Sequence, residues 1–76
     1  MDKHTIGMRL KKIRKEKNIS REKVAEDLGI SYSALSAYEI GQRIPRDYVK
    51  QKLAEYYDTS VQAIFFTPDV TDYNNE

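Results

Sequence analysis

The stretch SREKVAEDLGISYSALSAY, residues 20–38, predicts two short helices joined by a tight turn. Ser20 and Ser31 each stand just before a helical pattern, where a hydroxyl accepts a hydrogen bond from a free N–H of the first turn. Gly29 follows Leu28, the last apolar residue of the first helix, where the chain turns through positive φ and glycine does so at least cost. Two helices joined in this way are how a chain presents one helix to the major groove of DNA.

Apolar residues at helical spacing predict five helices, and no strand pattern or internal repeat accompanies them, so the expected fold class is all-α. The expected helices cover residues 6–17, 21–28, 32–40 and 47–57, with a short fifth helix that carries Val61, Ile64 and Phe65. Thr5 is the expected N-cap of the first helix, Asn18 its left-handed C′ residue, and Ser60 the cap of the fifth.

Seventy-six residues are enough for one domain, which we expect at residues 1–66. The helix-turn-helix motif is expected at 20–39 and a flexible tail at 67–76, where no periodicity remains. The side chains expected in the core are apolar and share the inward face of each helix: Ile6, Leu10, Ile13, Val24, Ala25, Leu28, Leu35, Tyr38, Val49, Leu53, Ala54 and Tyr57.

The charges are divided unevenly along the chain, although the net charge is only +1. Residues 1–46 carry 11 lysines and arginines against six acidic residues, a balance of +5, whereas residues 47–76 carry two against six, a balance of −4. The basic part contains the candidate DNA-reading motif, so this polarity suits a protein that offers one face to phosphate. Lysine-rich helices are also simply well solvated, and charge alone does not separate the two interpretations.

Composition argues against several other classes of protein. There is no cysteine for a disulfide or a thiolate metal site, and His4 is the single histidine, so no metal or cofactor is expected. We find no glycine-rich phosphate loop and no facing carboxylate pair, so an enzyme is not expected. The longest apolar run, residues 63–66, is far too short to cross a membrane, and the expected location is cytoplasmic.

The segment LGISYSALSAYEIGQRIPR, residues 28–46, resembles the signature of the Cro/C1-type (XRE-family) helix-turn-helix regulators of phages and bacteria. The positions that match the family pattern are Ala25, Leu28, Gly29, Ile30, Ser31, Ser36, Tyr38, Glu39, Gly41, Arg43 and Pro45, together with Arg14 in the first helix. The resemblance implies a compact five-helix, lambda-repressor-like domain that binds double-stranded DNA, with the motif in helices 2 and 3. It also implies a structural ion pair between Arg14 and Glu39, because a buried acid needs a partner.

The resemblance further implies which residues contact DNA. The implied base contacts are Tyr32, Ser33, Ser36 and Ala37. These side chains are short or carry a single hydroxyl, and none makes a bidentate pair with a base, so direct readout is expected to be modest. The implied phosphate contacts are Arg21, Ser31, Gln42, Arg43 and Arg46. Tyr32 could instead pack on its own helix, and capping is the alternative role of Ser31.

Members of this family usually bind as twofold dimers, and the candidate dimer contacts here are Tyr56, Phe65 and Phe66. The alternative for Phe66 is that it folds back over Leu10 and Leu53. The expected function is that of a small phage- or mobile-element-type repressor, acting as a homodimer on a palindromic operator. The alternative is an antitoxin-like or regulatory module that mainly binds a small partner protein and regulates its own gene through DNA.

Overall fold

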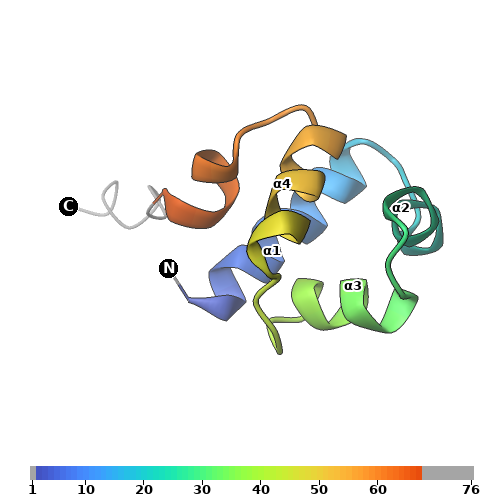
Figure 1. The fold of residues 1–76 in the computed structure, drawn as a ribbon, viewed down its shortest axis with the longest axis horizontal. Coiled ribbons are helices and arrows are strands. Elements are labelled where there is room, and N and C mark those ends of the chain that lie inside the picture. The colour runs from blue at the N-terminus through green and yellow to red at the C-terminus, as the bar shows by residue number, and fades with distance from the viewer. Residues whose placement is uncertain (1, 68–76) are drawn as a thin grey trace.

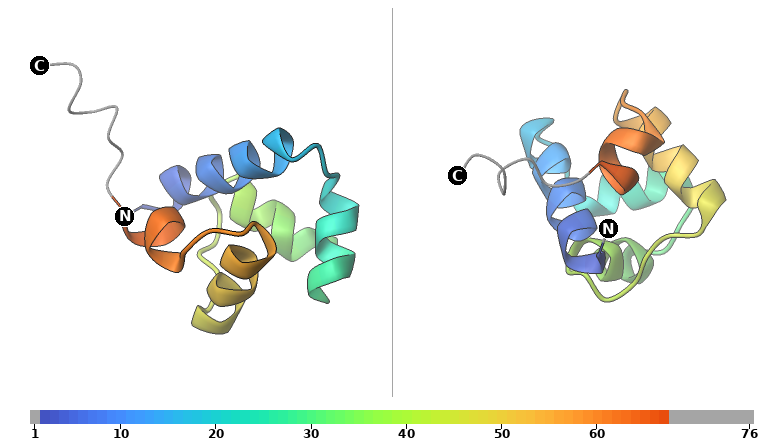
Figure 2. Two further views of the ribbon diagram at one scale, coloured as in Figure 1. Left: turned by 90° about the horizontal axis from the view of Figure 1, so that it is seen from above. Right: turned by 90° about the vertical axis from the view of Figure 1, so that its left-hand side faces the viewer.

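Residues 2–67, which the computed structural model describes, form four α-helices and a short π-helical segment (Figure 1). They are α1 (Lys3–Glu16), α2 (Arg21–Leu28), α3 (Tyr32–Glu39), α4 (Asp47–Tyr56) and η1 (Gln62–Phe66). Figure 2 shows α2 at one end of the molecule and the start of α1 beside η1 at the other, while α3 runs along one edge in Figure 1. The all-α, five-helix prediction is confirmed.

The predicted start of the first helix is wrong. Asp2, not Thr5, is the N-cap, because the Asp2 carboxylate accepts a 2.7 Å hydrogen bond from the Thr5 N–H and α1 begins at Lys3. Asn18 has a φ of 63°, as expected for the left-handed C′ residue. The first, third and fourth helices each end one residue earlier than predicted, because their last predicted residue is the half-helical C-cap: Lys17, Ile40 and Tyr57.

The turn between α2 and α3 has the geometry that the sequence predicts. Gly29 lies in the left-handed region with a φ of 70°, and the Ile30 N–H donates to the Ala25 carbonyl at 3.0 Å, which closes α2. Ser20 and Ser31 cap α2 and α3, each accepting from the N–H three residues further on at 3.1 and 3.0 Å. The two caps and the glycine therefore fix the direction in which α3 leaves α2.

The core is built from side chains of all five segments: α3 packs on α1 and α2, and smaller contacts join η1 to α1 and α4 to α2. Leu10, Leu35 and Leu53 are fully buried there, and complete burial of one such side chain contributes about 1.5–3 kcal/mol. The buried apolar residues are Ile6, Leu10, Val24, Ala25, Leu28, Leu35, Tyr38, Val49, Leu53, Ala54, Tyr57, Ile64 and Phe65. Ile13 and Val61 are only half-buried against this core, at the edge of the packing.

The backbones of α1 and α3 touch at Gly7. A Cβ atom there would lie 2.5 Å from the carbonyl oxygen of Glu39 and 2.6 Å from that of Tyr38. Any side chain at this position would push the C-terminal end of α3 away from α1. A glycine in the middle of α1 is therefore required for the close crossing that positions α3.

The predicted short fifth helix is present as a single π-helical turn. The Ser60 hydroxyl accepts from the Ala63 N–H at 3.0 Å, in the predicted capping role. Arg9 Nη1 donates to the carbonyls of Ala63 and Ile64, at 3.1 and 3.2 Å, which ties η1 to α1. Apart from Thr67, the predicted tail at 67–76 lies outside the described residues.

Candidate nucleic-acid interface

The first turn of α3 faces outward. Tyr32 is 47% exposed and Ser33 is also exposed, so both predicted base contacts are available to a ligand. Ala37, one turn further on, is half-buried. The hydroxyl oxygen of Ser36, the remaining candidate, is buried and has no hydrogen-bond partner within residues 2–67.

The loop after α3 carries the remaining cationic and amide candidates. Gln42, Arg43 and Arg46 are all exposed on it, beside the edge along which α3 runs. The Arg43 guanidinium lies over the Tyr38 ring, 5.7 Å from its centroid, and this cation–π contact limits where the charge can point. Ser31 is exposed, but its hydroxyl is already engaged in capping α3.

Behind this surface, one buried carboxylate holds two arginines. Arg14 binds Glu39 with two hydrogen bonds, 2.7 Å from Nε to Oε2 and 3.0 Å from Nη2 to Oε1, so the predicted ion pair is present. Arg21 adds a contact that the sequence did not indicate, from its Nε to Glu39 Oε1 at 2.8 Å. The Glu39 side chain is completely buried, and the paired guanidinium groups compensate its desolvation. This cluster joins α1, α2 and the end of α3.

Tyr57, just past α4, completes the surroundings of this cluster. Its ring is buried, and its hydroxyl has no hydrogen-bond partner in the described part of the chain. Burial raises the pKa of this hydroxyl well above its usual value, the Glu39 charge raises it further, and Arg14 opposes the shift. Tyr57 is therefore a neutral neighbour of the ion pairs.

Residues 10–64 match the helix-turn-helix family HTH_3, over a span that holds the α2–turn–α3 unit just described. The chain belongs to the helix-turn-helix family. The resemblance to Cro/C1-type regulators is thereby confirmed.

Similar proteins are regulators of transcription or of restriction–modification. The transcriptional regulator SinR from Bacillus licheniformis is 35% identical over 72 residues, which is 93% of this chain and 65% of SinR. PuuR from Escherichia coli K12 is 33% identical over 66 residues, 87% of this chain and 36% of PuuR. The crystal structure of the restriction-modification controller protein C.AhdI from Aeromonas hydrophila superposes with a TM-score of 0.76 at 31% identity. That match covers 82% of this chain and 94% of C.AhdI.

This helix-turn-helix chain therefore falls among the sequence-specific DNA-binding regulators. It spans about two thirds of the length of SinR and about one third of PuuR.

The candidate dimer surface differs in part from the prediction. Phe65 is buried in the core of the helix-turn-helix domain, so it is not a surface contact of the folded chain. Phe66 is 57% exposed and does not fold back over the core, and Lys50 Nζ lies 5.1 Å from its ring centroid. Tyr56 is half-buried, and its hydroxyl donates to Asp27 Oδ2 at 2.6 Å. Of the three candidates, Phe66 offers the most free apolar surface.

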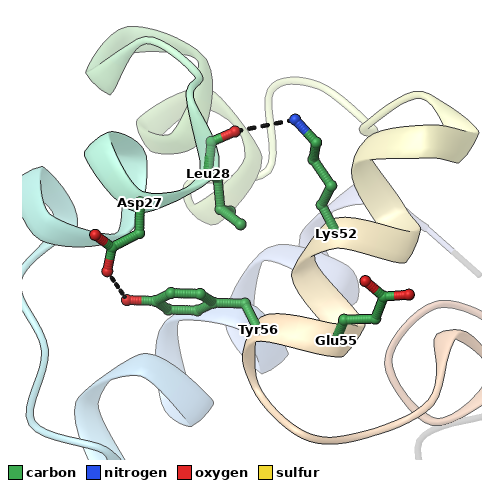
Figure 3. Close-up of a pocket in the computed structure, with 5 residues that line it drawn as sticks. All are labelled: Asp27, Leu28, Lys52, Glu55 and Tyr56. Atoms are coloured by element: carbon green, nitrogen blue, oxygen red, sulfur yellow. Dashed lines mark hydrogen bonds between the residues drawn. The ribbon is translucent and has the colours of Figure 1, made fainter.

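A shallow hollow between α2 and α4 lies beside Tyr56 (Figure 3). Its lining residues are Asp27, Leu28, Lys52, Glu55 and Tyr56. Lys52 Nζ donates to the Leu28 carbonyl at 3.1 Å, so both polar contacts drawn in Figure 3 tie α4 to the end of α2. Within residues 2–67 no three potential metal-ligating side chains gather in one place, and none of the helices there could span a membrane.

Two structural roles that matter to the interface were not predicted from the sequence. Gly7 sets the α1–α3 crossing, and the signal that could have found it is a glycine inside a helical pattern. The second is Arg21 as a partner of Glu39, which joins residues 18 positions apart. No short-range pattern indicates that contact.

Proposed function

We propose that this chain is a small repressor of the phage or mobile-element type, which binds a palindromic operator in double-stranded DNA as a homodimer. The observation that carries the proposal is the common edge formed by α3 and the loop after it. Tyr32 and Ser33 face outward on the first turn of α3, while Arg43 and Arg46 are exposed on the loop. This arrangement lets base edges and phosphates be contacted together.

The short side chains of the reading face limit direct readout. Tyr32 and Ser33 offer one hydroxyl each, Ala37 offers a methyl group, and the Ser36 hydroxyl is turned inward. None of them can form the bidentate pairs that discriminate guanine or adenine most strongly. Selectivity should therefore depend on thymine methyl groups and on DNA shape as well as on base-edge hydrogen bonds.

The test is selection of bound sequences from random double-stranded DNA with the purified chain. We expect enrichment of a palindrome whose half-site centres lie about one helical turn, about 10 base pairs, apart. A single half-site without symmetry would contradict the dimer. Absence of any enrichment would contradict DNA-directed repression and would favour the partner-protein alternative.

Two variants then separate the proposed base contacts from the phosphate contacts on the selected site. Tyr32→Ala should relax the preference at one position of each half-site. Arg46→Ala should weaken binding to all sequences alike and lower the salt slope by about one unit per protomer. A loss confined to one base position in Arg46→Ala would instead show that Arg46 reads the groove.

A further inference from the structure

Arg21 lies at the surface and is bound there by the Glu39 carboxylate, which is inaccessible to solvent. The Arg21 side chain is 23% exposed, whereas that of Glu39 is fully buried. The 2.8 Å hydrogen bond between them uses Nε of Arg21, which leaves the two terminal nitrogens for other acceptors. The guanidinium is thus fixed on its inner edge and accessible on its outer edge.

The charges of the cluster are not balanced. Arg14 and Arg21 bring two positive charges to the single negative charge of Glu39, so the group of three retains one positive charge. Arg14 uses both Nε and Nη2 on Glu39 and Nη1 on the Ile19 carbonyl, so its donors are largely committed inside the protein. Arg21 is therefore the member through which the remaining charge is presented to an anion.

Arg21 also lies beside the first residue of α3. The Glu39 carboxylate raises the pKa of Arg21, burial opposes the shift, and the Tyr32 hydroxyl raises the pKa further as a hydrogen-bond partner. One guanidinium therefore borders both the buried carboxylate and a proposed base-contacting side chain. Movement of Arg21 would disturb the surroundings of Tyr32.

We propose that Glu39 is a positioning residue for DNA binding, which holds Arg21 by Nε so that its terminal nitrogens meet a phosphate beside Tyr32. This inference rests on the proposed function and adds a role to an ion pair otherwise expected only to stabilise the fold. Arginine is required because its planar fork can bond a carboxylate through Nε and a phosphate through its outer nitrogens. An ordered guanidinium also loses less conformational entropy when the complex forms.

The hydrogen bond from Arg21 Nε to Glu39, called the anchor below, can be observed directly in the wild-type chain by NMR of the arginine side chains. In the free protein, the Nε–H signals of both Arg14 and Arg21 should exchange slowly with water, and in the DNA complex both should stay protected. A freely exchanging Arg21 signal in the free protein would overturn the proposal. Loss of its protection when DNA binds would also overturn it, because Arg21 would then have left Glu39.

Binding measurements test the consequence for DNA. Arg21→Lys keeps the charge but cannot reproduce the fork, so we expect it to bind the selected site about tenfold more weakly, with an unchanged salt slope. The matched variant is Arg46→Lys. Arg46 is an exposed proposed phosphate contact and belongs to none of the ion pairs found in residues 2–67. Arg46→Lys should lower the affinity for the selected site at most about threefold. Equal losses of DNA affinity in Arg21→Lys and Arg46→Lys would overturn the positioning role of Glu39.

Thermal unfolding of Arg21→Lys shows whether the variant is folded. If it is not, the NMR experiment on the wild-type complex decides, because it needs no substitution. Failure of the proposed function is a different result: the wild-type chain would then select no DNA at all, while the Arg21 signal of the free protein would still report on the anchor.

Discussion

The absence of a side chain at Gly7 allows the close crossing of α1 and α3. Alanine is about 1 kcal/mol better than glycine inside a helix, so Gly7→Ala would stabilise α1 if the site were open. The added methyl group would instead lie 2.5 Å from a backbone oxygen of α3, which cannot rotate away. We expect Gly7→Ala to lower the free energy of unfolding by about 1–3 kcal/mol, measured by urea denaturation.

The neighbouring residue provides the control for this substitution. Met8 is exposed on α1, so Met8→Ala should change the free energy of unfolding by no more than about 0.5 kcal/mol. Stabilisation of the chain by Gly7→Ala would show that α1 and α3 do not cross as closely as described.

Substitution of Glu39 should lower the free energy of unfolding more than the other substitutions considered for this chain. Glu39→Ala would leave Arg14 and Arg21 without their shared carboxylate, and the side chain of Arg14 is 9% exposed. Removing one partner of a buried ion pair typically costs about 3–5 kcal/mol, and we expect a loss of that size in thermal or urea unfolding. The exposed acid Glu26 is the matched control, and Glu26→Ala should be nearly neutral. Equal stability of the two variants would contradict the structural role of Glu39.

At the scale of helices, the sequence predicts best what is decided within one turn. Ser20, Gly29, Ser31 and Asn18 all have their expected capping or left-handed roles, because each depends on hydrogen bonds to residues a few positions away. The start of α1 was harder to predict, since Asp2 and Thr5 are both good N-caps. The choice between them is made by the carboxylate of Asp2 reaching the Thr5 N–H.

The parts of the interface that the sequence did not predict depend on contacts between distant residues. Arg21 meets Glu39 only after α2 has folded against the end of α3, so no periodicity in either helix indicates the contact. Phe65 and Phe66 are adjacent and both aromatic, yet one is buried and the other exposed. Both belong to η1, which the hydrogen bond from Arg9 to the Ala63 carbonyl ties to α1.

The contact between α2 and α4 predicts a response to pH. The Asp27 carboxylate raises the pKa of Tyr56 from 10.0 to about 12, and the Tyr56 hydroxyl in turn lowers the pKa of Asp27 below 3.8. Because the Tyr56 pKa is raised on folding, its contribution is fully present below pH 10.0 and is lost as the pH rises towards about 12. The Asp27 carboxylate also stabilises the fold, but its contribution has the opposite pH dependence: it is lost as the pH falls below 3.8.

We therefore expect Tyr56→Phe to lower the Tm at neutral pH by about 3–6 °C, since one inter-helix hydrogen bond is removed. The difference from the wild-type chain should narrow as the pH rises from 10.0 to about 12. Tyr48 is exposed on the same helix, and Tyr48→Phe serves as the control that should show no such difference. A gap between Tyr56→Phe and the wild type that does not change with alkaline pH would contradict the assignment.

At the scale of the whole molecule, α2 and η1 lie towards opposite ends (Figure 1), and the exposed Phe66 is the last residue of η1. In the proposed dimer, Phe66 supplies apolar contact area at the end that the reading motif leaves unused. We expect Phe66→Ser to weaken self-association at least tenfold, by sedimentation equilibrium, because an exposed aromatic ring is lost from the contact. Its Tm should change little, since Phe66 is 57% exposed and is not one of the buried core residues.

Tyr48 is similarly exposed and tests whether any surface aromatic residue would have the same effect. Tyr48→Ser should leave the monomer–dimer equilibrium unchanged. Equal weakening by both substitutions would assign the dimer contact to a broader surface that includes α4 and η1. No weakening by Phe66→Ser would exclude Phe66 from the dimer contact.

The reading face of α3 has a consequence for how such regulators diverge. Ser33 is exposed and lies apart from the cap at Ser31, the crossing at Gly7 and the ion pairs of Glu39. A substitution at Ser33 would therefore leave the residues that determine stability in place. For a regulator of the proposed kind, descendants can acquire new target sites by single substitutions at the start of α3, while the scaffold that presents them is inherited unchanged.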